Sequence, residues 1–272
     1  MDSPQETRER PDSALTPPGL QALIELAADK RAIVAFTGAG ISTESGIPDY
    51  RGPNGVWATQ NPPTIGDFLT NPDSRRLYWE SRLERFPKLI ATQPNQGHLA
   101  LTRLYEAGLL THVITQNIDG LHQRAGLPSD HVIELHGSAL EVQCLNCGSK
   151  WDGVTIHTRQ LGGEVVPHCE SCGGFLRAST VLFGESLPVG VMAKSREIAR
   201  SADLLIVIGS SLVVQPAARI PLIARQSGAM LGIVNLEETP LDRFADVVVR
   251  GRAGTSLNEL ARARLVNVIN SR

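Results

Sequence analysis

The segment VAFTGAGISTESGIPDYRG, residues 34–52, places a glycine-containing turn directly after an apolar run. An apolar run followed by G-x-G is typical of a strand that leads into a phosphate-binding loop of a parallel α/β sheet. The dinucleotide fingerprint G-x-G-x-x-G has a third glycine, and this sequence has Thr43 at that position. The next glycine is Gly46, which is followed by Pro48. The segment therefore predicts a nucleotide loop that does not continue straight into a helix.

Apolar, β-branched runs recur along the whole chain and alternate with amphipathic segments. Because several of these runs are apolar on both faces, they predict strands of a helix-covered parallel sheet. We therefore predict a doubly wound, Rossmann-like α/β fold. The predicted strands are residues 32–36, 112–115, 131–135, 179–183, 203–209, 231–235 and 246–249, and the predicted helices are residues 19–30, 96–108, 193–203 and 256–269.

Two stretches do not follow this alternation, and they predict a smaller zinc-binding and helical domain inserted into the sheet domain. One is rich in proline, asparagine and aromatic residues, and the other contains all four cysteines. The predicted division is a flexible tail at 1–16, a nucleotide-binding sheet domain at 17–138 and 178–272, a cofactor-loop and helical insertion at 50–94, and a zinc-binding insertion at 139–177.

Composition limits the possible partners and locations. The 272 residues carry a formal charge of −2 and no dense run of lysine and arginine, so nucleic acid is not expected as a partner. No stretch reaches the ~18 consecutive apolar residues that a membrane span needs, and the N-terminal residues lack the apolar core of a secretory signal. These features predict a cytoplasmic protein that does not bind membranes.

The four cysteines form a C-x2-C-x21-C-x2-C array: Cys144, Cys147, Cys169 and Cys172. Two such pairs in one insertion are typical of a structural zinc site, in which four thiolates fill a tetrahedron and leave no open position. Glycines follow each pair and allow the chain to turn back, so that amide N–H groups face the sulfur atoms. We expect one structural zinc ion per chain. Disulfides, or His168 as a competing ligand, are the alternatives.

Three further motifs follow predicted strands: TQNIDGLH (115–122), ELHGS (134–138) and GSSLVVQPA (209–217). Together with the opening loop and the cysteine array, they resemble the sirtuin family of NAD-dependent protein deacylases. The resemblance covers roughly residues 18–270. Within the family, PDYR, YW at 78–79, QPNQGHLAL and ELHGSALEV are most similar to the class II branch.

The resemblance implies that NAD is consumed as a co-substrate and that acylated-lysine proteins are the partners. It assigns Asn117 and Asp119 to positioning the ribose and accepting the nicotinamide carboxamide, and His136 to the general base that activates a ribose hydroxyl. The other six histidines, His98, His112, His122, His131, His157 and His168, are expected to have structural roles.

The remaining cofactor contacts are implied by the same resemblance. They are expected in the mobile loop at 41–51, in the turns that hold the phosphates, and near the adenosine. The residues are Gly38, Ala39, Gly40, Ser42, Ile47, Asp49, Tyr50, Arg51, Gln116, Ile118, Gly209, Ser210, Ser211, Asn235, Glu237 and Ala253.

The substrate peptide is expected to add as an extra strand along a V-x-F-G-E segment, so that backbone hydrogen bonds supply the affinity. The matching residues are Val181, Phe183, Gly184 and Glu185. The sequence departs from the family at Ser179 and Thr180, where many members have a proline.

The acyl group that the enzyme prefers is predicted from the helix of the first insertion. Family members that remove succinyl groups carry a Tyr-x-x-Arg pair there, and the corresponding positions are read as Arg82 and Arg85. We interpret these arginines as part of a solvated face on which Glu80 and Glu84 can pair with them. Neutral acyl groups are therefore expected to be removed faster than succinyl.

Three other functions remain as alternatives. Transfer of ADP-ribose to a protein side chain shares the step that releases nicotinamide. A non-catalytic NAD-sensing zinc module would need neither His136 nor Asn117. A dehydrogenase is disfavoured by Thr43 and by the QNID and HG motifs.

Overall fold

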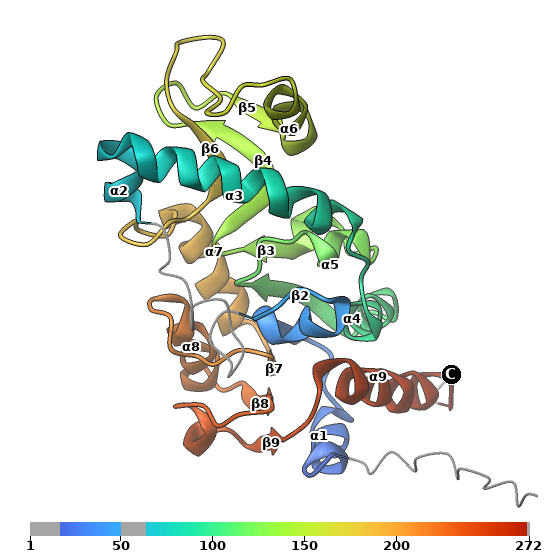
Figure 1. Ribbon diagram of the computed structural model, residues 1–272. Coiled ribbons are helices and arrows are strands. Elements are labelled where there is room, and N and C mark those ends of the chain that lie inside the picture. Colours follow the sequence, from blue (N-terminus) through green and yellow to red (C-terminus); the bar gives the residue numbers. More distant parts are fainter. Residues whose placement is uncertain (1–16, 50–63, 271–272) are drawn as a thin grey trace, which may run out of the picture.

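The computed structural model describes residues 17–49 and 64–270. Its larger part is a six-stranded sheet in the order β3-β2-β1-β7-β8-β9, in which all neighbouring strands run parallel (Figure 1). The strands are β1 (Ile33–Thr37), β2 (Leu110–Thr115), β3 (Val132–Glu134), β7 (Leu204–Ile208), β8 (Met230–Val234) and β9 (Val247–Val249).

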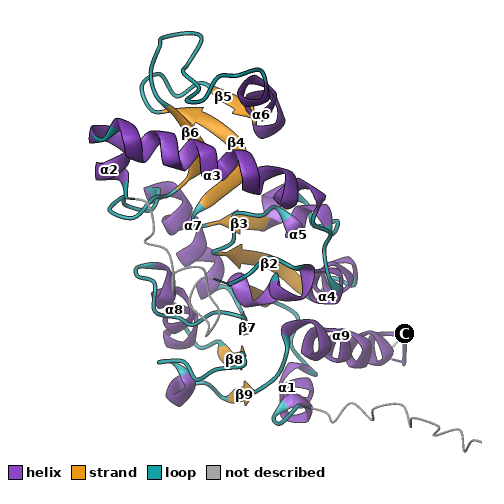
Figure 2. Ribbon diagram, viewed as in Figure 1, coloured by secondary structure: helices purple, strands orange, loops and turns teal. Residues whose placement is uncertain are grey.

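Helices cover both faces of this sheet (Figure 2). Alternate residues of β1 enter different cores: Ile33 and Ala35 pack with α1, α4 and α9, whereas Val34 and Phe36 pack with α7 and α8. This two-sided burial explains the continuous apolar runs and confirms the predicted doubly wound fold. The helices are α1 (Leu20–Ala27), α4 (Gln96–Glu106), α5 (Leu121–Arg124), α7 (Val189–Arg200), α8 (Ile220–Gln226) and α9 (Ala253–Asn270). Within the described residues, no helix has the length and apolar character to span a membrane.

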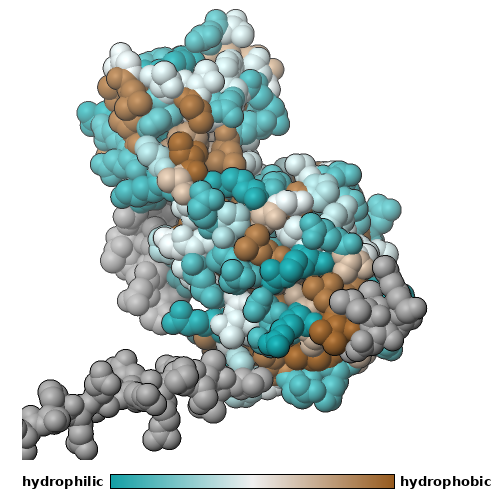
Figure 3. Space-filling view, turned by 90° about the vertical axis from the view of Figure 1, so that its right-hand side faces the viewer, coloured by the Kyte–Doolittle hydropathy of each residue, from teal (hydrophilic) through white to brown (hydrophobic). Residues whose placement is uncertain are grey.

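A three-stranded antiparallel sheet forms the centre of a smaller domain, the upper lobe in Figure 3. Its core joins Trp79, Ile156 and residues of the sheet, so the two predicted insertions share one core where they are described. The elements are β4 (Gly137–Cys144), β5 (Lys150–Asp152), β6 (Leu176–Thr180), α2 (Ile65–Thr70), α3 (Pro72–Ala91) and α6 (Gly153–Leu161). The predicted boundaries at 138/139 and 177/178 fall inside β4 and β6, which connect the two domains.

One predicted strand, residues 179–183, is wrong in its extent and its sheet. The strand ends at Thr180 and pairs with β4 in the small sheet. Beyond it the chain folds back, because the carboxylate of Glu185 accepts hydrogen bonds from the Leu182 N–H at 2.7 Å and from the Arg177 guanidinium. The other six predicted strands lie in the parallel sheet.

The carboxyl ends of β1, β2, β3 and β7 form one edge, and the order of the sheet reverses between β1 and β7. Backbone hydrogen bonds connect the loops there: the Gly38 N–H donates to Ile208, and the Gln116 N–H donates to Thr37. In open α/β sheets this switch point is where ligands bind. The motifs that carry the predicted chemistry follow these strands.

Candidate active site

The glycines of the opening loop are required by close contact with a loop from the other half of the sheet. A Cβ atom at Gly38 would lie 2.7 Å from the Gly209 carbonyl oxygen, and one at Gly40 would lie 2.7 Å from the Gly209 Cα. The Gly40 N–H donates to the Gly209 carbonyl at 2.8 Å. The loop after β1 and the loop after β7 therefore meet at a surface of backbone atoms without side chains. Such a surface fits the close approach of a nucleotide phosphate. Ala39, with η1 (Ala39–Ile41), continues this surface.

The loop continues into two short 3-10 turns, η1 and η2 (Thr43–Ser45), in place of an α-helix. At Gly46 the backbone adopts φ +88°, which favours glycine. The predicted break after the second glycine is thus confirmed.

Ser42 connects the two polar residues of the QNID motif. Its hydroxyl donates to Asp119 Oδ2 at 2.7 Å and accepts from Asn117 Nδ2 at 3.1 Å. All three side chains are buried. Burial raises the pKa of Asp119, although the Leu121 N–H and the Ser42 hydroxyl oppose that shift by stabilising the ionised form.

Gln116 and Ile118 fix the QNID motif to its neighbours. The Gln116 side chain donates to Ser210 Oγ at 2.7 Å and so connects the loop after β2 with the loop after β7. The Ile118 carbonyl accepts from the Ala139 N–H at 2.8 Å, which attaches the motif to β4. The predicted residues from three distant motifs therefore lie together.

His136 lies between β3 and β4 with a defined tautomer. Its Nδ1 is 2.8 Å from the Gln116 carbonyl oxygen, and because a carbonyl can only accept, Nδ1 must carry the proton. Nε2 is therefore left with a lone pair. Burial lowers the pKa of His136, partly offset by the hydrogen bond to the Gln116 carbonyl, and so favours the neutral ring. A neutral imidazole with an available Nε2 has the form that a general base requires.

The predicted peptide segment begins beside this histidine. The Val181 N–H donates to the His136 carbonyl at 2.9 Å. The side chain of Phe183 is 38% exposed, its carbonyl accepts from the Ile65 N–H, and Gly184 has φ +88°. Glu185 is held by Arg177 in a two-pronged ion pair, so its carboxylate shapes the segment.

The remaining predicted cofactor contacts, near the adenosine and in the loop at 41–51, are more dispersed. Asn235 lies at the end of β8, where its side chain donates to the Glu237 carbonyl at 2.8 Å, and Ala253 begins α9. Ser211 directly follows Ser210, Ile47 donates its N–H to the Ser42 carbonyl, and Asp49 ends the described part of the loop. The predicted contacts Tyr50 and Arg51 lie outside the described residues.

Two anchors of the nucleotide loop were not predicted from the sequence. The Asn95 side-chain amide donates to the Ile41 carbonyl at 2.7 Å and to Ser45 Oγ at 2.9 Å. The Glu44 carboxylate accepts from the Gly254 N–H at 2.7 Å, in the first turn of α9. A helix-capping asparagine and an acidic residue in the loop were the available signals, but neither reveals its distant partner.

Arg82 is not part of a solvated charged face, which corrects the prediction at this position, whereas Glu84 and Arg85 are exposed as predicted. Its guanidinium packs 4.4 Å from the centre of the Phe86 ring and donates to the Ala139 carbonyl at 3.0 Å. Glu80 lies 4.0 Å from Arg76 instead. The Nε and Nη2 atoms of Arg82 are buried, and neither has a hydrogen-bond partner among the residues that the structure describes.

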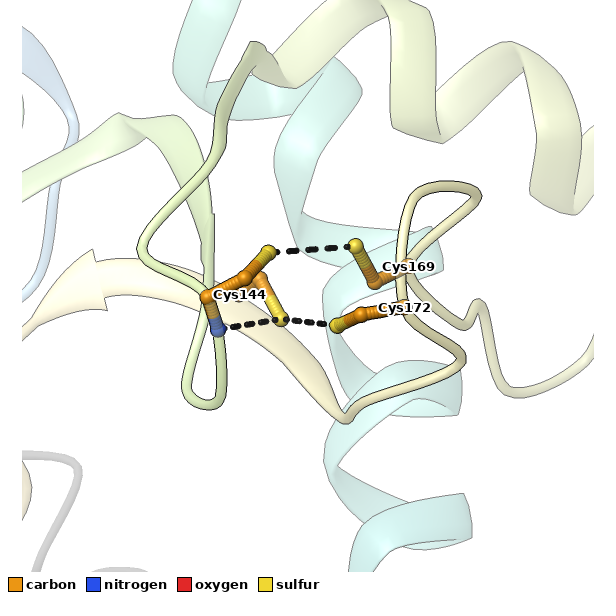
Figure 4. A group of neighbouring side chains, drawn as sticks. Cys144, Cys169 and Cys172 are labelled. Carbon is orange, nitrogen blue, oxygen red and sulfur yellow. Dashed lines mark hydrogen bonds between the residues drawn. The ribbon is translucent and has the colours of Figure 1, made fainter.

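The four cysteines converge at one end of the small sheet. Their sulfur atoms all lie within 4.8 Å of one another, with Cys144 and Cys172 at 3.5 Å and Cys147 and Cys169 at 3.6 Å. Figure 4 shows the loop of Cys144 opposite the loop of Cys169 and Cys172, with the sulfur atoms of the two loops facing one another. Zinc–sulfur bonds of ~2.3 Å place tetrahedral sulfur atoms about 3.8 Å apart, so this donor set fits zinc. The distances exclude the disulfide alternative, since bonded sulfurs are ~2.05 Å apart.

Backbone turns support the sulfur cluster as predicted. The Asn146 N–H lies 3.3 Å from Cys144 Sγ, and Gly148 and Gly173 adopt positive φ angles of +73° and +68°. His168 places Nδ1 2.9 Å from the Val166 carbonyl and is outside the metal-binding group found among the described residues. Four thiolates leave no open coordination position, so a zinc ion here would be structural.

A doubly wound sheet with polar loops at its switch point places the chain among the nucleotide-binding α/β enzymes. Within that class, the chain belongs to the Sir2 family, whose model matches residues 38–216. The predicted sirtuin membership is thereby confirmed.

Relatives in three organisms show the extent of this similarity. The chain is 45% identical over 240 residues to the NAD-dependent protein deacetylase of Caldivirga maquilingensis, covering 88% of this chain and 91% of that protein. It is 41% identical to the deacetylase of Rhodopseudomonas palustris, covering 88% and 94%, and 43% identical to the NAD-dependent protein deacylase of Aquifex aeolicus, covering 84% and 93%.

Solved structures of Sir2 proteins have the same fold as this chain. A complex of Sir2 with a p53 peptide and NAD+ has a TM-score of 0.79 at 40% identity and covers 89% of this chain and 95% of that one. The ADP-ribose complex of a mutant Sir2 homologue has a TM-score of 0.82 at 37% identity, with coverages of 90% and 96%.

Proposed function

We propose that this chain is an NAD-dependent protein-lysine deacylase that acts mainly on acetyl-lysine. NAD, when bound, supplies ADP-ribose as the acceptor of the acyl group, with release of nicotinamide. The relatives named above carry this activity in their names, and the chain retains the polar cluster that the reaction needs. The observation that carries the proposal is the tautomer of His136, whose Nδ1–H is committed to the Gln116 carbonyl while Nε2 remains basic.

The roles of the other residues follow from their contacts. Ser42 holds the Asn117 amide and the Asp119 carboxylate in one orientation, so both can bind polar groups of the ribose and nicotinamide without rearranging. His136 Nε2 accepts a proton from a substrate hydroxyl. Val181 to Glu185 lie beside His136, where an extended peptide would pair with the backbone groups of this segment that its own hydrogen bonds do not use. The four cysteines hold a structural zinc ion that stabilises the small domain.

The experiment is nicotinamide release from an acetyl-lysine peptide, with the acylated ADP-ribose product identified by mass spectrometry. His136→Tyr should lower turnover by ~10²-fold or more, the usual contribution of a general base, with little change in NAD affinity. His112→Gln is the control, because His112 lies near the start of β2, where its ring packs against His131 and not against the QNID side chains. Wild-type turnover in His136→Tyr would contradict the assignment, and label from NAD that stays on protein would favour ADP-ribosyl transfer instead.

Two finer assignments rest on the sequence alone. The class II branch is proposed from the motifs at residues 48–51, 78–79, 93–101 and 134–142, and a cytoplasmic location from the overall composition.

A further inference from the structure

A buried chain of polar side chains lies directly beneath the QNID motif. Thr37 and Thr115, the last residues of β1 and β2, are paired in register, and their hydroxyls are 2.8 Å apart. Thr115 Oγ1 also accepts from the Asn117 N–H at 3.0 Å, and Thr37 Oγ1 lies 2.9 Å from His122 Nε2. All of these side chains are buried.

The directions of the hydroxyl hydrogen bonds set the tautomer of His122. With the Thr37 hydroxyl donating its single proton to Thr115, His122 Nε2 is the donor to Thr37; the reverse order, Thr115 to Thr37 and Thr37 to Nε2, would place the ring proton on Nδ1. A neutral ring with its proton on Nε2 has a bare acceptor at Nδ1. That Nδ1 is buried and has no partner in the described part of the chain.

A second buried histidine supplies the complementary group. His98 Nδ1 accepts from the Asn95 N–H at 3.3 Å, so the proton of the neutral ring must lie on Nε2. This Nε2–H is buried and, within residues 17–49 and 64–270, also lacks a partner. The two rings are in contact, with 5.0 Å between their centroids, and a donor on His98 beside His122 favours the tautomer of His122 in which Nδ1 is the acceptor.

Both rings stay neutral for a physical reason. Burial lowers the pKa of His98 to about 4, and burial, followed by the proximity of His98, lowers the pKa of His122 well below its ordinary value. The tautomers are therefore the only proton positions to be decided near pH 7.

The far end of this chain is the anchor of the nucleotide loop. Asn95, whose N–H binds His98, holds Ile41 and Ser45 through its side chain. Asn117 is thus held twice: Ser42 of that loop fixes its side-chain amide, and Thr115 fixes its backbone. Buried polar groups cost stability compared with well-packed apolar ones, so a chain at this location needs a reason beyond packing.

We infer that His98, His122, Thr37 and Thr115 form a tautomer-ordered chain of complementary donors and acceptors, here called the histidine–threonine chain, that positions Asn117 and continues through the His98–His122 ring contact to Asn95. These four are positioning residues, since they act through Asn117. The inference rests on the proposed role of Asn117 in binding the ribose.

Thr115→Val tests the chain with little change in shape, because valine keeps the branched side chain and removes only the oxygen. We expect kcat for nicotinamide release to fall about 10-fold or more, while KM for NAD changes by less than about 3-fold, because a bond that orients a bound reactant is lost. Thr115→Ser restores the oxygen and should recover most of kcat. Unchanged kcat in Thr115→Val, or no recovery in Thr115→Ser, would overturn the inference.

Tautomers measured in the wild-type protein test the chain independently of turnover and of any variant's folding. In ¹⁵N-imidazole NMR spectra, His98 and His122 should both show the Nε2–H form and should not titrate near neutral pH, whereas an exposed histidine does. An Nδ1–H form of His122 would overturn the inference. Failure of the wild-type protein to release nicotinamide from any acyl-lysine peptide would instead refute the proposed function, and the tautomers would still be measurable.

Discussion

Ser42→Ala removes the single hydroxyl that joins Asn117 to Asp119. Ser42 is 1% exposed, and its Oγ lies 3.1 Å from the Asn117 amide and 2.7 Å from the Asp119 carboxylate. Alanine would leave both buried groups short of a partner, at about 1–2 kcal/mol each, or about 2–4 kcal/mol together. If the transition state loses the same amount, kcat/KM falls by ~30-fold to ~10³-fold.

The pH dependence of this variant gives a second, independent result. Burial raises the pKa of Asp119, and the Ser42 hydroxyl is one of the groups that lowers it. Without that hydroxyl the pKa rises further, so the carboxylate becomes protonated at a higher pH than in the wild type. The acid limb of kcat/KM should therefore move to higher pH.

The assay is the initial rate of nicotinamide release from an acetyl-lysine peptide between about pH 5 and about pH 9, a range that includes the pKa of a typical general base. Thr43→Ala is the matched control, since Thr43 is the exposed neighbour and its hydroxyl donates to the Gly40 carbonyl. A Ser42→Ala enzyme within about 3-fold of the wild type, with an unmoved acid limb, would refute the bridging role.

The remaining predictions concern zinc, acid stability and the acyl group. Cys144→Ser should lose bound zinc, folding and activity together, and metal analysis of active wild-type protein should find one zinc per chain; much less would contradict a structural site. Because the pKa of His98 is about 4 when folded and ~6.5 when unfolded, the unfolded state binds the proton first as pH falls. The free energy of unfolding should keep its full value above pH ~6.5 and fall by about 3 kcal/mol as the pH decreases to about 4. Urea titrations that show no such loss would exclude a neutral buried ring. Acetyl-lysine should be a better substrate than succinyl-lysine, because Arg82 is held by Phe86 and the Ala139 carbonyl; a ten-fold succinyl preference by kcat/KM, abolished by Arg82→Met or Arg85→Met, would reverse this.

Local patterns were enough to predict most of the fold. Runs that are apolar on both faces correctly placed six of the seven predicted strands in the parallel sheet. A strand covered by helices on both faces is apolar at every position, so its sequence is a continuous apolar run. The cysteine spacing predicted the metal cluster for a similar reason, since ligand geometry is encoded within each C-x-x-C pair. The run at 179–183 was misassigned because the Arg177–Glu185 ion pair that folds it back involves no apolar pattern.

The site was predictable only where its residues belong to motifs. Ser42, Asn117, Asp119 and His136 were each identified, but not the contacts that connect them. Thr37 lies 78 positions from Thr115 and 85 positions from His122, so no local pattern could pair them. Arg82 shows the opposite case, in which a charged helix pattern predicted exposure and packing against Phe86 prevented it.

The missing third glycine can now be explained by what stabilises the loop. In a dinucleotide fingerprint the helix after the glycines holds the loop, and the third glycine lets that helix pack closely. Here Thr43 occupies that position, its hydroxyl closes the turn onto the Gly40 carbonyl, and no close helix packing is needed. Side chains from distant elements hold the loop instead: Asn95 binds it from α4, and Glu44 attaches it to the positive N-terminal end of α9. A loop held by such discrete contacts can present Ser42 to Asn117 and Asp119 while residues 46–49 follow a path that a continuous helix would forbid.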